Sequence, residues 1–289
     1  MLSRLNYLGY DTKDMNPSKR IIVMFAIGLI LSLSGWLGFI LALGIIDRSV
    51  LLSLPFGAVW VLGAALILAV ALRKRSRIAG FLQGLPGYSP ERAEKAIRFI
   101  PAFFILAVPF HICVLGIAAL SLGKGGFASH FPLLIAGLGI PGIVMVIPFV
   151  HLLKSLETFA QDVPFAKEER SYSIRTKMLA SLALNTAGSL LTLSALSLSF
   201  LPRAAAGDEL RPLLIETGAV LIIMLALTFL NLTESLRLVT RPVQKFTDGV
   251  KGMMGKEIDL RQAVKVKSRD ELGLIARVFA HLVGGITLV

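Results

Sequence analysis

The sequence predicts an all-α polytopic membrane protein, a six-helix transmembrane bundle followed by a dimeric cytoplasmic coiled coil. Of its 289 residues, 55% are hydrophobic and 17% are charged, and the mean hydropathy of +0.76 is too high for a soluble domain. Six apolar runs are each long enough to cross the roughly 30 Å of a bilayer's hydrocarbon. After the last run, apolar residues recur at alternating spacings of three and four, which is the pattern of a left-handed coiled coil.

The membrane part is expected to be a sensor domain over residues 21–233, preceded by a polar cytoplasmic segment, 1–20. Its six spans, arranged as three hairpins, are expected near 21–46, 51–72, 99–122, 132–153, 178–201 and 213–233. The first run is longer than a signal-peptide core, so we expect a retained anchor. Pro109, Pro141 and Pro148 should kink the third and fourth spans, and small residues such as Gly142 and Gly188 predict close helix contacts.

The charge distribution predicts the orientation. The net charge is +12, and only four of the 30 Lys and Arg residues, namely Arg48, Lys124, Arg203 and Arg211, lie in alternate loops. The positive-inside rule therefore places both termini in the cytoplasm, and it explains the basic balance without a nucleic-acid partner. The three outer loops are too short to fold as a ligand-binding domain, so a signal would have to act on the membrane helices.

Two apolar strips follow the bundle, separated by a non-periodic connector, 255–270. The first consists of Leu232, Leu236, Val239, Val243, Phe246, Val250 and Met253, and the second of Leu272, Ile275, Phe279, Leu282, Ile286 and Val289. Each strip is apolar on one side only, and a parallel pairing with a second copy of the chain would bury both. The strips therefore predict a homodimer.

The same segment carries a resemblance. Thr240–Val243 opens the first strip's helix, Asp259-Leu260 lies in the connector, and Ser268–Gly273 opens the second helix. Residues 234–289 resemble a HAMP domain, the parallel four-helix linker of bacterial transmembrane receptors. The resemblance implies signalling roles for Pro242, Asp270, Glu271 and Gly273. It implies a coiled-coil core of Val243, Phe246, Val250, Ile275, Phe279 and Leu282. Ser268 and Glu271 also fit an ordinary capping box.

The function that this resemblance implies is that of a receptor input module in the bacterial inner membrane, surrounded by membrane lipid. It would relay a signal to a C-terminal output domain or to cytoplasmic signalling proteins, first of all of the methyl-accepting chemotaxis type. The membrane part of a six-span adenylate cyclase or of a sensor histidine kinase is the alternative, and a transporter or channel is the rival class. The second strip reaches Val289 in register, which predicts a continuation into an output coiled coil.

Three polar residues in the spans are candidates for function, because ionisable and amide groups are costly in hydrocarbon. They are His111, Asn185 and Glu216. For His111 a hydrogen bond to a neighbouring helix is the structural alternative, and Glu216 near a helix N-terminus fits an ordinary dipole contact. No nucleophile elbow, phosphate loop or zinc spacing is present, so we expect no catalytic site, cofactor or metal in this chain.

Overall fold

The computed structural model describes residues 16–42, 48–122, 127–160, 163, 173–205, 207, 210–254, 275 and 278. Within these residues every regular element is an α-helix, which confirms the predicted all-α class. The elements are α1 (Pro17–Ala42), α2 (Arg48–Leu51), α3 (Leu54–Leu82), α4 (Pro90–Leu122), α5 (Phe127–Val144), α6 (Val146–Phe159), α7 (Ile174–Ala205) and α8 (Leu210–Met254).

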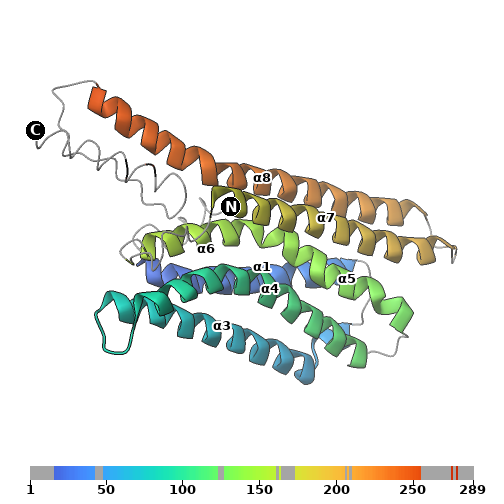
Figure 1. Cartoon of the computed structure of the whole chain (residues 1–289). Coiled ribbons are helices and arrows are strands. Elements are labelled where there is room, and N and C mark those ends of the chain that lie inside the picture. Colours follow the sequence, from blue (N-terminus) through green and yellow to red (C-terminus); the bar gives the residue numbers. More distant parts are fainter. Residues whose placement is uncertain are drawn as a thin grey trace, which may run out of the picture.

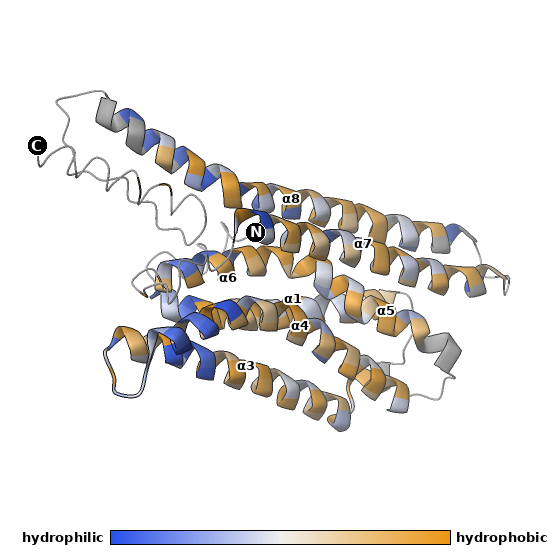
Figure 2. Ribbon diagram, viewed as in Figure 1, coloured by the Kyte–Doolittle hydropathy of each residue, from blue (hydrophilic) through white to orange (hydrophobic). Residues whose placement is uncertain are grey.

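The long helices form a bundle that is suited to a membrane. Among the described residues, α1, α3, α4, α7 and α8 are each long and apolar enough to cross a bilayer, and α5 and α6, bent by 50° at their junction, meet the same test as a pair. The start of α1, the α3–α4 turn and the end of α8 lie at the same end of the bundle (Figure 1). Hydrophilic residues gather at this end and along the distal part of α8 (Figure 2). The chain is thus a multi-pass membrane protein.

Helices α1 and α4 begin earlier than the hydropathy predicts, because polar caps lie ahead of their apolar runs. Helix α4 starts at Pro90 instead of residue 99, since the Ser89 hydroxyl accepts a bond of 3.3 Å from the Arg92 amide. Helix α1 starts at Pro17 instead of residue 21, since Asn16 Oδ1 accepts a bond of 2.9 Å from the Ser18 amide. Both prolines occupy the first helical position, where their missing N–H costs nothing.

Helix α3 also runs on beyond its predicted end, through the basic stretch to Leu82. It ends where Gly84 adopts a φ of 66° and the Leu85 amide donates to the Gly80 carbonyl at 3.0 Å. The basic segment between the second and third spans is therefore mostly helix, and only a short turn joins α3 to α4.

The fourth span breaks at Met145, between α5 and α6. Pro148 causes the break, because it has no N–H for the Val144 carbonyl and its ring clashes with that carbonyl. The kink predicted for this span is confirmed. Helix α4 contains Pro101 and Pro109 but continues unbroken from Pro90 to Leu122.

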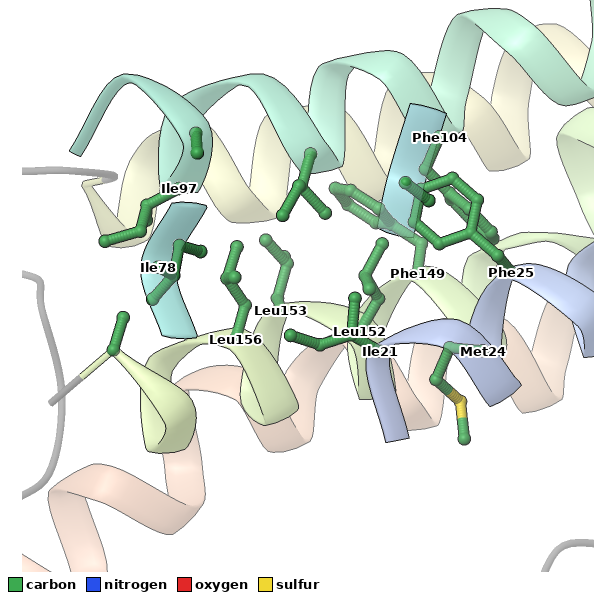
Figure 3. Close-up of a cluster of buried hydrophobic side chains, with 14 of the residues drawn as sticks. Ile21, Met24, Phe25, Ile78, Ile97, Phe104, Phe149, Leu152, Leu153 and Leu156 are labelled. Atoms are coloured by element: carbon green, nitrogen blue, oxygen red, sulfur yellow. The ribbon is translucent and has the colours of Figure 1, made fainter. Parts of the chain in front are cut away.

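Two apolar clusters hold the bundle together. The first joins α1, α3, α4 and α6 around Phe25, Phe104 and Phe149, with Ile78 and Ile97 at one side (Figure 3). The second joins α1, α3, α4, α5 and α7 around Trp36, which stacks on Phe56 and donates to the Leu133 carbonyl at 3.2 Å. Within the described residues, α8 places no fully buried apolar side chain in either cluster.

Helices α5 and α7 cross with their backbones in contact. A Cβ added to Gly142 would lie 2.8 Å from Gly188 Cα, and one added to Gly188 would lie 2.7 Å from the Ile143 nitrogen. Only glycine fits at these two positions, because the obstructing atoms belong to backbone. The close helix contact predicted at Gly142 and Gly188 is confirmed, and it fixes α7 against the end of α5.

Candidate functional site: a buried polar junction

Asn231 of α8 is the centre of a polar junction among three helices. Its side chain is 1% exposed, and its amide nitrogen donates to the Ile143 carbonyl of α5 at 2.7 Å and to Asn185 Oδ1 of α7 at 2.8 Å. An amide nitrogen carries two hydrogens, so both bonds can form at once. One side chain of the last helix thus connects α5 and α7.

The backbone carbonyl of Ile143 can accept a hydrogen bond from another helix because the fourth span is broken. It lies in the last turn of α5, where helix carbonyls have no amide partner four residues ahead in the same helix. In hydrocarbon such a group costs several kcal/mol if it stays unpaired. Asn231 therefore supplies from α8 the donor that an unbroken helix would have supplied from its own backbone.

Two further polar pairs continue the contact between α7 and α8. Ser181 and Ser235 meet through their hydroxyls one turn toward the basic end, and Ser235 donates to the Asn231 carbonyl at 2.7 Å. Ser189 Oγ and Thr228 Oγ1 lie 3.4 Å apart on the other side of the asparagines. We call the three pairs the polar ladder, which consists of Ser181–Ser235, Asn185–Asn231 and Ser189–Thr228. It holds α8 to α7 by hydrogen bonds at successive helical turns.

The polar ladder is a costly way to attach a helix. Asn231 Oδ1 is buried without a hydrogen-bond partner among the described residues, a situation that costs about 1–3 kcal/mol. Hydrogen bonds between membrane helices return only about 0.6 kcal/mol each on average. A leucine at position 231 would avoid this penalty, but it would leave the Ile143 carbonyl without its donor from α8. Buried intramembrane polar groups of this kind are candidates for function.

Of the three predicted intramembrane candidates, Asn185 belongs to the junction. His111 lies elsewhere, 5% exposed between α3 and α4, with its ring against Gly63. A Cβ added at Gly63 would overlap the imidazole ring. His111 Nε2 has no partner in the described part of the chain. The ring of His111 therefore lies in the contact between α3 and α4, and its functional role stays a prediction.

Glu216 closes the opposite end of the α7–α8 hairpin. Its carboxylate accepts a bond of 3.0 Å from Arg203, and each side chain is about one third exposed (33% for Arg203 and 34% for Glu216). This ion pair gives Glu216 a structural partner. Among the described residues, no group of three or more His, Cys, Asp or Glu side chains is arranged to hold a metal ion.

The HAMP-like residues are described only in part. Pro242 lies inside α8, which continues on both sides of it, so no separate helix begins there. Val243 is exposed, Phe246 is half-buried, and Val250 lies in the same helix. Ile275 is helical and exposed. Asp270, Glu271, Gly273, Phe279 and Leu282 lie outside the described residues, and the four-helix coiled coil is not shown.

Sequence reasoning missed Asn231. Its signal was available, because it is an amide within an apolar run, as Asn185 is in the preceding span. It lies two residues before the expected end of the sixth span at residue 233, where a polar residue looks interfacial. Asn231 is buried against the break at Met145, where it donates to the Ile143 carbonyl, an acceptor that no hydropathy pattern identifies.

The comparisons with known proteins give no relative for this chain: no protein family, no curated protein and no solved structure matches it.

Proposed function

We propose that this chain is the input module of a transmembrane receptor, in which the membrane bundle biases α8 and α8 carries the bias to a HAMP-like segment. The observation that carries the proposal is the bond from Asn231 of α8 to the Ile143 carbonyl at the break of the fourth span. A change in the angle between α5 and α6 would alter this acceptor. The change would then reach α8 without any intermediate helix.

The shape of α8 supports this role. The helix is 45 residues long, whereas about 20 residues cross the hydrocarbon. Its distal part extends past the bundle as one continuous helix (Figure 1). A rotation or shift of α8 in the membrane is therefore delivered to residues 234–254 as rigid motion.

Coupling also requires an element with two arrangements. The polar ladder suits that requirement, because α8 is attached by hydroxyls and amides that can exchange partners. The unpaired Asn231 Oδ1 has an unused acceptor capacity, so a second arrangement can form at least as many bonds as the first. An apolar contact of interlocking side chains would hold one position only.

The proposal includes the setting of the module. The basic end of the bundle faces the cytoplasm of a bacterial cell under the positive-inside rule. The HAMP-like segment pairs with that of a second copy and passes the signal to a cytoplasmic output domain or to signalling proteins. A methyl-accepting chemotaxis output is the first class, and a cyclase or histidine kinase output is the second.

A chimera tests the function. The full chain is joined after Val289, in heptad register, to the cytoplasmic part of a chemoreceptor, and kinase control is measured in cells. Asn231→Leu should shift basal output several-fold, and so should Glu271→Ala in the HAMP-like segment. Thr233→Val is the matched control, because its hydroxyl donates only to its own helix, to the Phe229 carbonyl at 2.9 Å. Unchanged output in the first two variants, with normal membrane levels, would refute the proposal.

A transporter is the second candidate function, and one observation favours it. A broken span beside buried polar groups is the arrangement in which transporters bind their substrates or coupling ions. The purified chain in proteoliposomes distinguishes the two functions. Solute or cation flux that Asn231→Leu abolishes would establish transport, whereas the receptor module should catalyse none.

A further inference from the structure

The outward face of α8 carries one apolar stripe along the whole helix. Starting at Ile215, the residues recur at spacings of three and four without interruption. We call them the α8 stripe, and they are Ile215, Gly218, Ile222, Leu225, Phe229, Leu232, Leu236, Val239, Val243, Phe246, Val250 and Met253. The cytoplasmic seam that begins at Leu232 thus extends backward through the membrane in the same register.

The bundle leaves this stripe uncovered. Seven of its large residues are exposed, from 40% at Val243 to 73% at Leu225, whereas Val239 and Phe246 are half-buried. A Cβ at Gly218 would meet nothing within 4 Å. The buried side chains Met224, Asn231 and Ser235 lie on another face of α8, toward α5 and α7. One face therefore attaches α8 to the bundle, and a different one carries the stripe.

Lipid cannot cover the whole stripe. The charged residues Glu234, Arg237 and Arg241 mark the place where α8 leaves the hydrocarbon. Leu236 lies among these charged residues and Val243 lies beyond them, and both are exposed on the same face. Apolar residues in water at heptad spacing require a protein partner.

The placement of charge identifies the partner. In a parallel coiled coil the positions beside the seam face their counterparts on the partner helix, and like charges there repel. In α8 from residue 226 onward, these flanking positions hold no charge. Ala226, Thr233, Thr240, Pro242, Thr247, Gly249 and Met254 flank the seam, and Thr228 and Ser235 flank it on the side where α8 contacts α7. All charged residues of 226–254 lie at positions that face away: Glu234, Arg237, Arg241, Lys245, Asp248 and Lys251. An identical, parallel helix can therefore approach without repulsion.

We propose that the membrane part of the α8 stripe, from Ile215 to Leu232, is a contact surface for α8 of a second copy of this chain, in parallel orientation. The inference rests on the proposed dimeric HAMP-like segment, whose seam it continues. It adds that the two chains meet inside the bilayer as well as below it. Gly218 then allows close backbone approach at the outer end of the contact.

Cysteine cross-linking of the full chain in lipid vesicles tests the contact. In a Cys113→Ser background, Ile222→Cys, Leu225→Cys and Phe229→Cys place single thiols on the stripe. Ile223→Cys and Leu230→Cys are matched controls, because both residues are apolar and exposed at the same depth of α8 but lie off the stripe. After oxidation the three stripe variants should form several-fold more disulfide-linked dimer than the two controls.

A second pair of variants separates this inference from the proposed function. Val243→Cys lies on the stripe outside the hydrocarbon, and Gln244→Cys is its exposed neighbour off the stripe. If Val243→Cys cross-links strongly but the stripe variants and the control variants in the membrane give equal yields of dimer, the inference is overturned and the HAMP-like dimer stands. Equal or absent cross-linking everywhere overturns both. If the stripe variants cross-link more than their controls in the membrane, but Val243→Cys does not cross-link more than Gln244→Cys, the inference is supported and the proposed cytoplasmic dimer is refuted.

Discussion

Helices α3 and α8 both lie at the edge of the bundle, yet they are attached by different chemistry. Each leaves most of its apolar stretch uncovered. Helix α3 inserts Phe56, Ile67 and Ile78 into the two apolar clusters and accepts the His111 ring at Gly63. Helix α8 is attached by the polar ladder and by the Arg203–Glu216 pair at its outer end.

The difference indicates which helix can move. Interlocked apolar side chains resist small displacements, because every contact loses dispersion energy at once. Hydroxyl and amide groups can exchange partners between neighbouring turns at a cost of a fraction of a kcal/mol to about 2 kcal/mol each. We infer that α3 is held in one position in the bundle and that α8 can be displaced relative to it. Four tests probe this comparison.

The largest difference is expected between two isoleucines. Ile78 in α3 is 0% exposed in the first cluster, and Ile78→Ala should lower the free energy of unfolding by about 2–5 kcal/mol. Ile222→Ala, on the uncovered face of α8, should change it by less than about 0.5 kcal/mol in monomeric protein. Denaturant unfolding in detergent measures both. Equal losses would show that α8 is packed as firmly as α3.

The next test substitutes alanine for two glycines, and the two changes in the free energy of unfolding should have opposite signs. The Cβ of Gly63→Ala would overlap the His111 ring, so we expect a loss of about 1–3 kcal/mol from overpacking. The Cβ of Gly218→Ala would enter open space, and the better helix propensity of alanine should stabilise the monomer by up to about 1 kcal/mol. Thermal unfolding in detergent suffices, and a destabilising Gly218→Ala would contradict the assignment of an uncovered face.

A substitution in the polar ladder should have a smaller effect on stability and a larger effect on the position of α8 against α7. Asn231→Leu should lower the free energy of unfolding by up to about 2 kcal/mol, because it leaves the Ile143 carbonyl unpaired, while removal of the unpaired Asn231 oxygen offsets part of that loss. A disulfide between Ser189→Cys and Thr228→Cys reports the α7–α8 distance, because their hydroxyls lie 3.4 Å apart. Its rate of formation should fall several-fold in the Asn231→Leu background. An unchanged rate would mean that Asn231 does not position α8.

The ion pair at the outer end should contribute least. Glu216→Gln removes the charge that Arg203 contacts at 3.0 Å, and both groups are partly hydrated. We expect a loss below about 1 kcal/mol that shrinks further in high salt. Unfolding at low and high ionic strength checks this. A large, salt-independent loss would make the pair a second firm attachment of α8.

Hydropathy and proline placement predicted much of this fold from the sequence. The apolar runs gave the membrane helices, Pro148 with Pro141 gave the kinked fourth span, and Gly142 and Gly188 gave the closest helix crossing. Each of these features depends on residues close together in the chain or on backbone chemistry that one residue type dictates. The helix starts at Pro17 and Pro90 were missed, because their caps, Asn16 and Ser89, lie outside the apolar runs.

Of the two asparagines at the centre of the candidate site, the sequence analysis predicted only Asn185. Asn231 matters because a carbonyl 88 residues earlier is freed by a bend, and that acceptor exists only in three dimensions. His111 is the converse case. Alone in its span it suggests chemistry, but its packing depends on Gly63 in another helix, whose role no local pattern indicates. The residues Asp270, Glu271 and Gly273 keep the roles that the HAMP resemblance implies as predictions.

The length of α8 beyond Asn231 determines how far the end of the helix moves when the helix tilts. Met254 lies 23 residues beyond that side chain, which corresponds to about 35 Å of helix at 1.5 Å per residue. With its fulcrum at the buried asparagine, a tilt of about 5° would swing the far end by about 3 Å over this length. Displacements of about 1–2 Å are enough to switch packed helices between alternative arrangements. Under the proposed function, a slight change in the bend of the fourth span would therefore produce a larger displacement at the end of α8.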